Sequence, residues 1–129
     1  MPLTVGVKTK GERVFVLIPK GRIDSETNDI FDKKIKNVLG NNPASLVIDM
    51  SDVYYISSVG LNSILHAYKE MIKNKGKILL TNLQPQIRKV FDVIKALPSH
   101  SIFANMSEVD EYLDAIQTGE VANPEDGNL

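Results

Sequence analysis

The sequence predicts an α/β fold: a single domain with a mixed, mostly parallel sheet, a leading β-hairpin and about four helices. The main observation is that short apolar runs alternate with segments whose apolar residues recur at helical spacing. The inner runs, such as Leu46-Val47-Ile48, are continuously apolar, which is typical of parallel strands that helices cover on both faces. The chain has 129 residues, which is the length of one domain.

The chain opens with a predicted hairpin. Apolar residues alternate with polar or small ones from Leu3 to Val7, and Gly11-Glu12 interrupts the pattern. The continuous apolar run from Val14 to Ile18 follows and is predicted to be the second strand, buried on both faces. Pro19-Lys20-Gly21 is predicted to end this strand, because proline and glycine interrupt regular pairing.

A first helix and a second inner strand come next. Asp24, Ser25 and Thr27 are residues that commonly begin helices. Gly40-Asn41-Asn42-Pro43 is predicted to end the helix, and Leu46-Val47-Ile48 is predicted to be a strand. The apolar residues that define the helix by their spacing are Ile30, Phe31, Ile35, Val38 and Leu39.

The second half of the chain continues the alternation. A second helix is predicted to begin at Ser57-Ser58, a strand follows at Ile78-Leu79-Leu80, and a third helix is stopped by Pro98. Ser107, with Asp110 three residues later, resembles a capping pair and predicts a last helix. The residues that give these helices their apolar faces are Leu61, Ile64, Leu65, Tyr68, Met71, Ile72, Leu83, Ile87, Val90, Phe91, Ile94, Val109, Tyr112, Leu113 and Ile116.

The composition excludes several classes of function. Fifteen basic residues against 16 acidic ones give a net charge of -1, which lacks the cationic excess that nucleic-acid binding favours. The absence of cysteine excludes disulfides and thiol catalysis. We expect a cytoplasmic protein without membrane contact, because the sequence shows no signal peptide and no apolar run of about 18 residues.

Residues 118–129 are polar and are predicted to be a disordered acidic tail behind a folded domain of residues 1–117.

No cofactor or metal ion is expected. Neither the dinucleotide-binding nor the P-loop glycine spacing is present. The two histidines, His66 and His100, have no second ligand at metal-binding spacing and are interpreted as surface residues.

Three aspartates form the first candidate site. Asp49 and Asp52 follow an inner strand, and Asp24 follows the strand before it, so the three carboxylates could share the sheet edge where open α/β sheets place ligands. One interpretation is ordinary turn and cap chemistry, since aspartate accepts hydrogen bonds from free backbone amides. The other is a cation or phosphoacceptor site.

The second candidate site is Ser57-Ser58-Val59-Gly60-Leu61. A hydroxyl at a helix N-terminus can cap the helix, and Ser58 is read as the cap from composition alone. It can also carry a phosphate, which the helix dipole favours there. Gly60 is unfavourable in a first helical turn, so the sequence predicts that the backbone needs a close approach or conformational freedom at this point.

In this order the motifs resemble the STAS family, the domain shared by sulfate transporters and bacterial anti-sigma factor antagonists. The resemblance covers about residues 3–117 and predicts a STAS-like domain over residues 1–117. The matching segments are Gly21-Arg22-Ile23-Asp24, Leu46-Val47-Ile48-Asp49-Met50-Ser51, Tyr55-Ile56-Ser57-Ser58-Val59-Gly60-Leu61, Asn82-Leu83-Gln84-Pro85-Gln86-Ile87 and Ile102-Phe103.

The resemblance implies an anti-sigma factor antagonist that is phosphorylated on the serine opening the second helix. It places the phosphoacceptor at Ser58, with Ser57 as the alternative. The antagonist pattern reads Asp-Ser-Ser/Thr-Gly, whereas this chain has Ser57 in place of the aspartate and Val59 in place of the second hydroxyl residue. The partner-binding residues implied by the resemblance are Asp24, Ser57, Ser58, Val59, Gly60, Asn62 and Ser63.

The expected cycle involves two partners. The unmodified chain binds an anti-sigma factor with serine kinase activity and so frees a sigma factor, and phosphorylation releases the complex until a serine phosphatase restores it. The chain is then a substrate and not an enzyme, a monomer or weak dimer that binds no nucleic acid.

Two other functions compete with this interpretation. An aspartyl-phosphate receiver would use Asp49 or Asp52 as acceptor, but it needs an acidic pair after an early strand, and only Asp24 is acidic there. A scaffold of the same fold in a larger signalling assembly would not be phosphorylated.

Overall fold

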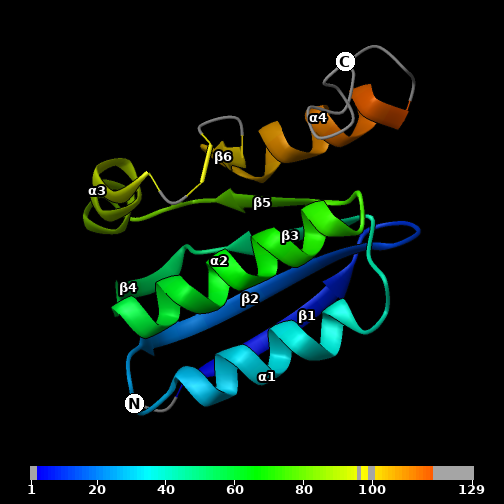
Figure 1. Cartoon of the computed structure of the whole chain (residues 1–129). Coiled ribbons are helices and arrows are strands. Elements are labelled where there is room, and N and C mark those ends of the chain that lie inside the picture. The colour runs from blue at the N-terminus through cyan, green and yellow to red at the C-terminus, as the bar shows by residue number, and fades with distance from the viewer. Residues whose placement is uncertain (1–2, 96, 99–100, 118–129) are drawn as a thin grey trace.

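A mixed β-sheet flanked by helices forms the centre of the computed structural model, which describes residues 3–95, 97–98 and 101–117 (Figure 1). The described residues form six strands and four helices, which confirms the predicted fold class. The strands are β1 (Thr4–Thr9), β2 (Val14–Ile23), β3 (Ser45–Asp49), β4 (Asp52–Ile56), β5 (Lys77–Thr81) and β6 (Ile102–Phe103). The helices are α1 (Asn28–Leu39), α2 (Ser58–Lys73), α3 (Pro85–Ile94) and α4 (Met106–Gln117).

The sheet is parallel except at its first strand. Its strand order is β1-β2-β3-β5-β6, and β1 pairs antiparallel with β2 as the predicted hairpin. All other pairs are parallel. The long strand β2 has two successive partners on one side, because Val14 to Leu17 pair with β3 and Lys20 to Ile23 pair with β4.

The prediction that β2 ends at Pro19 was wrong, and β4 was not predicted. The strand continues to Ile23, because Pro19 lies where β2 changes its parallel partner from β3 to β4. A residue without an amide hydrogen is tolerated where the ladder is interrupted. Gly21 has a φ of 126°, and the pairing with β4 shifts register just after it.

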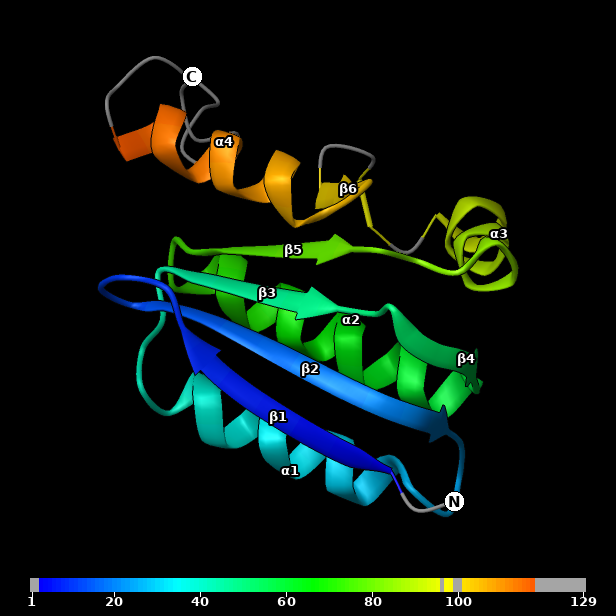
Figure 2. The same ribbon diagram turned by 180° about the vertical axis from the view of Figure 1, so that it is seen from behind.

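The two sheet faces are covered unequally. Helices α1 and α2 pack on one face, where the larger core contains buried residues such as Leu17, Phe31 and Ile64. On the other face, Val109 of α4 packs with buried strand residues that include Val16. The contact of α4 with β2 is confined to the start of that strand, where Val14 and Val16 belong to this cluster (Figure 2), and Val7 of β1 is exposed. The prediction that helices cover both faces therefore holds only in part.

Two helix ends differ from the prediction. Helix α3 ends at Ile94, before Pro98, because Lys95 adopts the left-handed conformation with a φ of 56°. Helix α4 is capped by Asn105 and not by Ser107. The Asn105 side chain accepts a hydrogen bond from the Glu108 amide at 3.0 Å, and the Glu108 carboxylate accepts one from the Ala104 amide at 3.0 Å.

Candidate functional site

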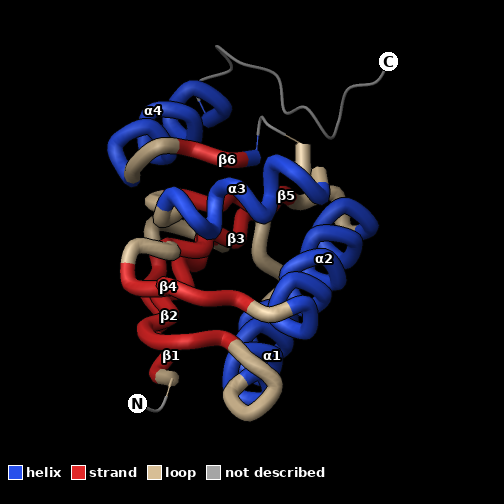
Figure 3. The backbone as a smooth tube through the Cα atoms, turned by 90° about the vertical axis from the view of Figure 1, so that its left-hand side faces the viewer, coloured by secondary structure: helices blue, strands red, loops and turns tan. Residues whose placement is uncertain are grey.

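The carboxyl ends of β2 and β4 form one edge of the molecule together with the starts of α1 and α2 (Figure 3). The two strands stay paired to their last residues, and the Ser57 amide donates a hydrogen bond to the Ile23 carbonyl at 2.8 Å. Asp24 and the serines therefore lie beside each other, although they are more than 30 residues apart in the chain.

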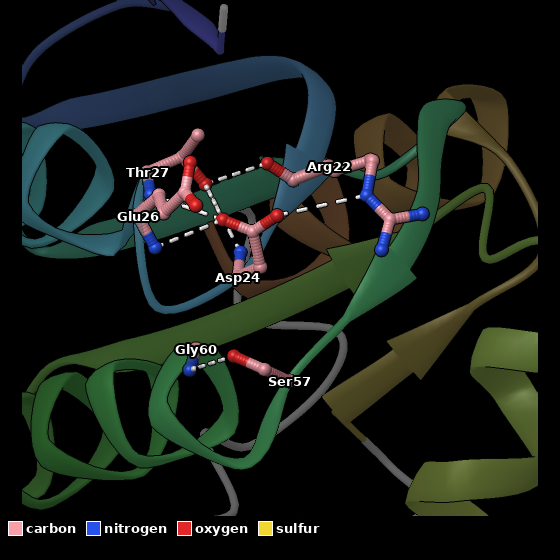
Figure 4. Close-up of polar contacts among 6 residues, drawn as sticks. All are labelled: Arg22, Asp24, Glu26, Thr27, Ser57 and Gly60. Carbon is pink, nitrogen blue, oxygen red and sulfur yellow. Dashed lines mark hydrogen bonds and ion pairs between the residues drawn. The ribbon is translucent and has the colours of Figure 1, made fainter.

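Ser57, and not Ser58, caps α2. Ser57 has an extended backbone, and its hydroxyl accepts a hydrogen bond from the Gly60 amide at 3.4 Å (Figure 4). Ser58 is the first residue of the helix, and its side chain is exposed. In the sequence, Ser58 is a candidate both for the helix cap and for the phosphoacceptor. In the structure Ser57 is the cap, and Ser58 is exposed to solvent.

Gly60 is a glycine because the helix start touches the strand ends. A Cβ at this position would lie 2.6 Å from Cγ2 of Ile23 and 2.8 Å from Cγ1 of Ile56. Both isoleucines are buried in the larger core. The predicted close backbone approach is confirmed, and it holds the first turn of α2 against β2 and β4.

Asp24 is engaged by its own loop. Its Oδ1 accepts hydrogen bonds from the amides of Glu26 at 3.0 Å and Thr27 at 3.1 Å, and from the Thr27 hydroxyl at 3.2 Å (Figure 4). Partial burial alone would raise the pKa of Asp24. The hydrogen bonds from Thr27 and Glu26, together with the Arg22 guanidinium 3.6 Å away, outweigh that effect and lower the pKa below its usual value. Asp24 therefore shapes the turn that leads into α1.

Acidification should weaken this turn. Because the pKa of Asp24 is lowered on folding, its contribution is complete above the ordinary carboxyl pKa of 3.8 and is lost as the pH falls through the lower folded-state value. Asp24→Asn does not titrate but can still accept from the loop amides. We expect this variant to lose unfolding free energy less steeply with falling pH in urea denaturation below about pH 4. An unchanged slope would contradict this role of the carboxylate.

The three candidate aspartates do not share one edge. Ile48 pairs with Leu17, so Asp49 lies beside the middle of β2, about 20 Å along the strand from Asp24. The Asp49 carboxylate accepts hydrogen bonds from the Ser51 amide and the Asn82 side chain, both at 3.1 Å, which is turn chemistry. Within the described part of the chain, no group of three His, Cys, Asp or Glu residues is arranged to hold a metal ion.

The other predicted contact residues divide into exposed and buried ones. Val59 is 42% exposed, and Asn62 is also exposed. Ser63 is only 6% exposed and lies between α1 and α2. Its hydroxyl donates to Asp32 at 3.0 Å and accepts from the Asn28 amide group at 3.2 Å. This geometry makes Ser63 a link between the two helices.

Asp32 is the charged member of this link. The hydrogen bond from Lys36, at 2.8 Å, and the one from Ser63 lower the pKa of Asp32 below its usual value, against a smaller opposing effect of burial. Asp32 therefore stays ionised at neutral pH and is a strong acceptor for the Ser63 hydroxyl.

Removing the Ser63 hydroxyl should destabilise the protein. Ser63→Ala deprives the buried Asn28 side chain of a partner, and we expect a loss of about 1–3 kcal/mol of unfolding free energy. The matched control is Ser58→Ala, which removes an exposed hydroxyl from the same helix and should change the free energy by less than about 0.5 kcal/mol. Equal stability of the two variants in chemical denaturation would contradict the linking role.

Sequence reasoning missed a cluster around β4. Val53 and Ile56 are both buried. The two residues between them, Tyr54 and Tyr55, are exposed at 58% and 41%. The Arg22 guanidinium lies 4.3 Å from the centre of the Tyr55 ring. The signal in the sequence was two adjacent tyrosines within an apolar segment, which break the alternation of a regular strand.

The comparisons with known proteins agree on one protein family. The sequence pattern of the STAS domain matches residues 7–109. A relative from Bordetella bronchiseptica, BtrV, is named as an anti-sigma factor antagonist and is 26% identical over 74 residues. That match covers 57% of this chain and 64% of the relative, so the chain spans less than two thirds of the relative's length.

Solved structures share the fold. An anti-sigma factor antagonist from Mycobacterium paratuberculosis is 26% identical, with a TM-score of 0.72 over 89% of this chain and 94% of that one. The antagonist SpoIIAA in its unphosphorylated form is 17% identical, with a TM-score of 0.74 over 93% and 100%. SpoIIAA from Bacillus in its phosphorylated form is 17% identical, with a TM-score of 0.70 over 85% and 99%. None of the described helices is both long and apolar enough to span a membrane.

Proposed function

This chain belongs to the STAS domain family, and from that premise we propose that it is an anti-sigma factor antagonist regulated by phosphorylation of Ser58. Without phosphate it binds an anti-sigma factor that has serine kinase activity. After phosphorylation it releases that partner, and a serine phosphatase restores it. The chain is the substrate of the kinase and not an enzyme.

The observation that carries this proposal is the exposed Ser58 hydroxyl at the first position of α2. A kinase must reach the hydroxyl, and Ser58 is accessible, whereas Ser57 is partly buried and caps the helix. A phosphate at the start of a helix is favoured by the dipole and by the free backbone amides of the first turn. The fold is compatible with such a modification, since SpoIIAA has a solved phosphorylated form.

The surface around Ser58 supports protein binding. Four exposed large hydrophobic residues belong to β4 and to the first turns of α1 and α2: Ile30, Tyr54, Tyr55 and Val59. Exposed apolar and aromatic side chains favour a protein partner, and these four belong to elements that begin or end at this edge of the molecule. We expect the contact surface to include Asp24, Ser57, Ser58, Val59 and Asn62. Gly60 and Ser63, also predicted as contact residues, are buried and support this surface from within the fold.

The proposal is tested by a phosphorylation experiment with an anti-sigma factor kinase from the same cell. The wild-type chain is mixed with the kinase and ATP, and the phosphorylated peptide is mapped by mass spectrometry. We expect one acid-stable phosphate on Ser58, and weaker binding to the kinase afterwards. Binding that produces no phosphate would favour a scaffold. An alkali-labile phosphate on Asp49 or Asp52 after treatment with acetyl phosphate and magnesium would favour a receiver.

A further inference from the structure

We propose that Arg22, held over the Tyr55 ring, is the anchor that binds a carboxylate of the anti-sigma partner in the unphosphorylated state. This inference rests on the proposed function, because it names the chemistry by which the same surface recognises the same partner. It adds a contact residue outside the serine segment, Ser57 to Leu61, because Arg22 is the second-to-last residue of β2.

The geometry of Arg22 is that of a preorganised anion receptor. Its Cζ lies 4.3 Å from the centre of the Tyr55 ring, and the two residues are opposite each other in the pairing of β2 with β4. Stacking on a ring fixes the plane of a guanidinium and reduces the entropy lost when it binds. The side chain is still 62% exposed, so the receptor faces solvent.

Most of the hydrogen-bond donors of Arg22 are free. In the described structure its Nε alone faces a protein acceptor, Oδ2 of Asp24 at 3.6 Å, which is longer than a hydrogen bond. Figure 4 shows the two terminal nitrogens pointing away from Asp24. Paired terminal nitrogens match the two oxygens of a carboxylate in a bidentate arrangement, which a lysine does not reproduce.

The charged residues near Arg22 leave the exposed side of its guanidinium available to a carboxylate of the partner. Lys20 lies two residues before Arg22 on the same strand, and Asp52 is opposite Lys20 in the pairing. Asp24 uses its other oxygen, Oδ1, for the amides of its own loop. Asp24 pairs with Arg22 through Nε, which leaves the terminal nitrogens on the exposed side of Arg22 complementary to an acidic group from outside.

The same arrangement explains how a phosphate would release the partner. Ser58 lies three residues beyond Tyr55, the strand neighbour of Arg22, which corresponds to about 10 Å. This separation is close to the Debye length at about 0.1 M salt, so the two exposed positions are partly screened from each other, and the screening weakens when the partner displaces water between them. The acidic group that Arg22 attracts is thus repelled by the phosphate.

The test measures the affinity of unphosphorylated variants for the anti-sigma factor kinase that phosphorylates the wild-type chain. Arg22→Ala and Arg22→Gln should each raise Kd about tenfold or more and make it less dependent on salt. Arg22→Lys should recover part of the affinity. Tyr55→Phe keeps the ring and should bind as the wild type does, whereas Tyr55→Ala should weaken binding. Because the Arg22 side chain is exposed, the Arg22 variants should unfold at the wild-type denaturant concentration.

The matched control is Lys69→Ala, which removes the same charge from an exposed position of α2, about 16 Å along the helix axis from Ser58. We expect its Kd to stay within about twofold of the wild-type value. Wild-type affinity of both Arg22→Ala and Arg22→Gln, with the wild type still bound and phosphorylated on Ser58, would overturn the inference and leave the proposed function intact. A wild type that binds no anti-sigma factor kinase would overturn both.

Discussion

Ser58→Ala is expected to bind the anti-sigma factor constitutively and to take up no phosphate, whereas Ser58→Asp is expected to lose at least about tenfold in affinity. The hydroxyl is not needed for binding, because the proposed contact surface is formed mainly by its neighbours. A negative charge is tolerated at a free helix N-terminus but becomes costly when a partner removes it from water. Isothermal titration with each variant, and intact mass after incubation with kinase and ATP, measure both effects.

Stability measurements keep binding effects apart from folding effects. Ser57 caps α2, so Ser57→Ala should lower the unfolding free energy by about 0.5–2 kcal/mol and leave phosphorylation largely intact. Ser58 does not cap the helix, so Ser58→Ala should change it by less than about 0.5 kcal/mol. Phosphate on Ser58→Ala, or wild-type affinity of Ser58→Asp, would defeat the assignment of the phosphosite.

Gly60→Ala is expected to destabilise the protein by about 1–3 kcal/mol, which is the largest single effect on stability among the variants of the serine segment. In an open helical position the same change would stabilise by up to about 1 kcal/mol, so the sign of the effect is diagnostic. The added Cβ would meet Ile23 and Ile56 at less than 3 Å. The contacting atoms are bonded to the branched Cβ of each isoleucine, so they move only if χ1 or the backbone moves.

The control for Gly60→Ala is Asn62→Ala, an exposed change in the same helix that should be neutral or slightly stabilising. Thermal denaturation of both variants gives the comparison. Because the start of α2 must move away from the strand ends to admit the methyl group, we also expect slower phosphorylation of Ser58 in Gly60→Ala. A stabilised Gly60→Ala variant would show that the close contact with the isoleucines does not constrain the helix.

Much of the fold could be predicted from local patterns. The strands β2, β3 and β5 lie inside the sheet, so their residues form continuous apolar runs. The helices bury one side only, which leaves a helical period in the sequence. Strand β4 could not be predicted in this way, since it pairs with β2 on one side and carries two exposed tyrosines. Its existence depends on the continuation of β2 past Pro19, a long-range pairing that no local pattern encodes.

Some features of the candidate site could likewise be predicted from adjacent residues, and others depend on long-range packing. Adjacent residues were enough to predict that serines open α2, that Gly60 marks a close backbone approach or conformational freedom, and that the motifs resemble those of the STAS family. The folded structure was needed to show that Ser57 is the cap, that Ser63 is buried against α1, and that Asp49 lies far from Asp24. These facts depend on which backbone amides are free and on which strands are neighbours. Both follow from the packing of distant segments against one another.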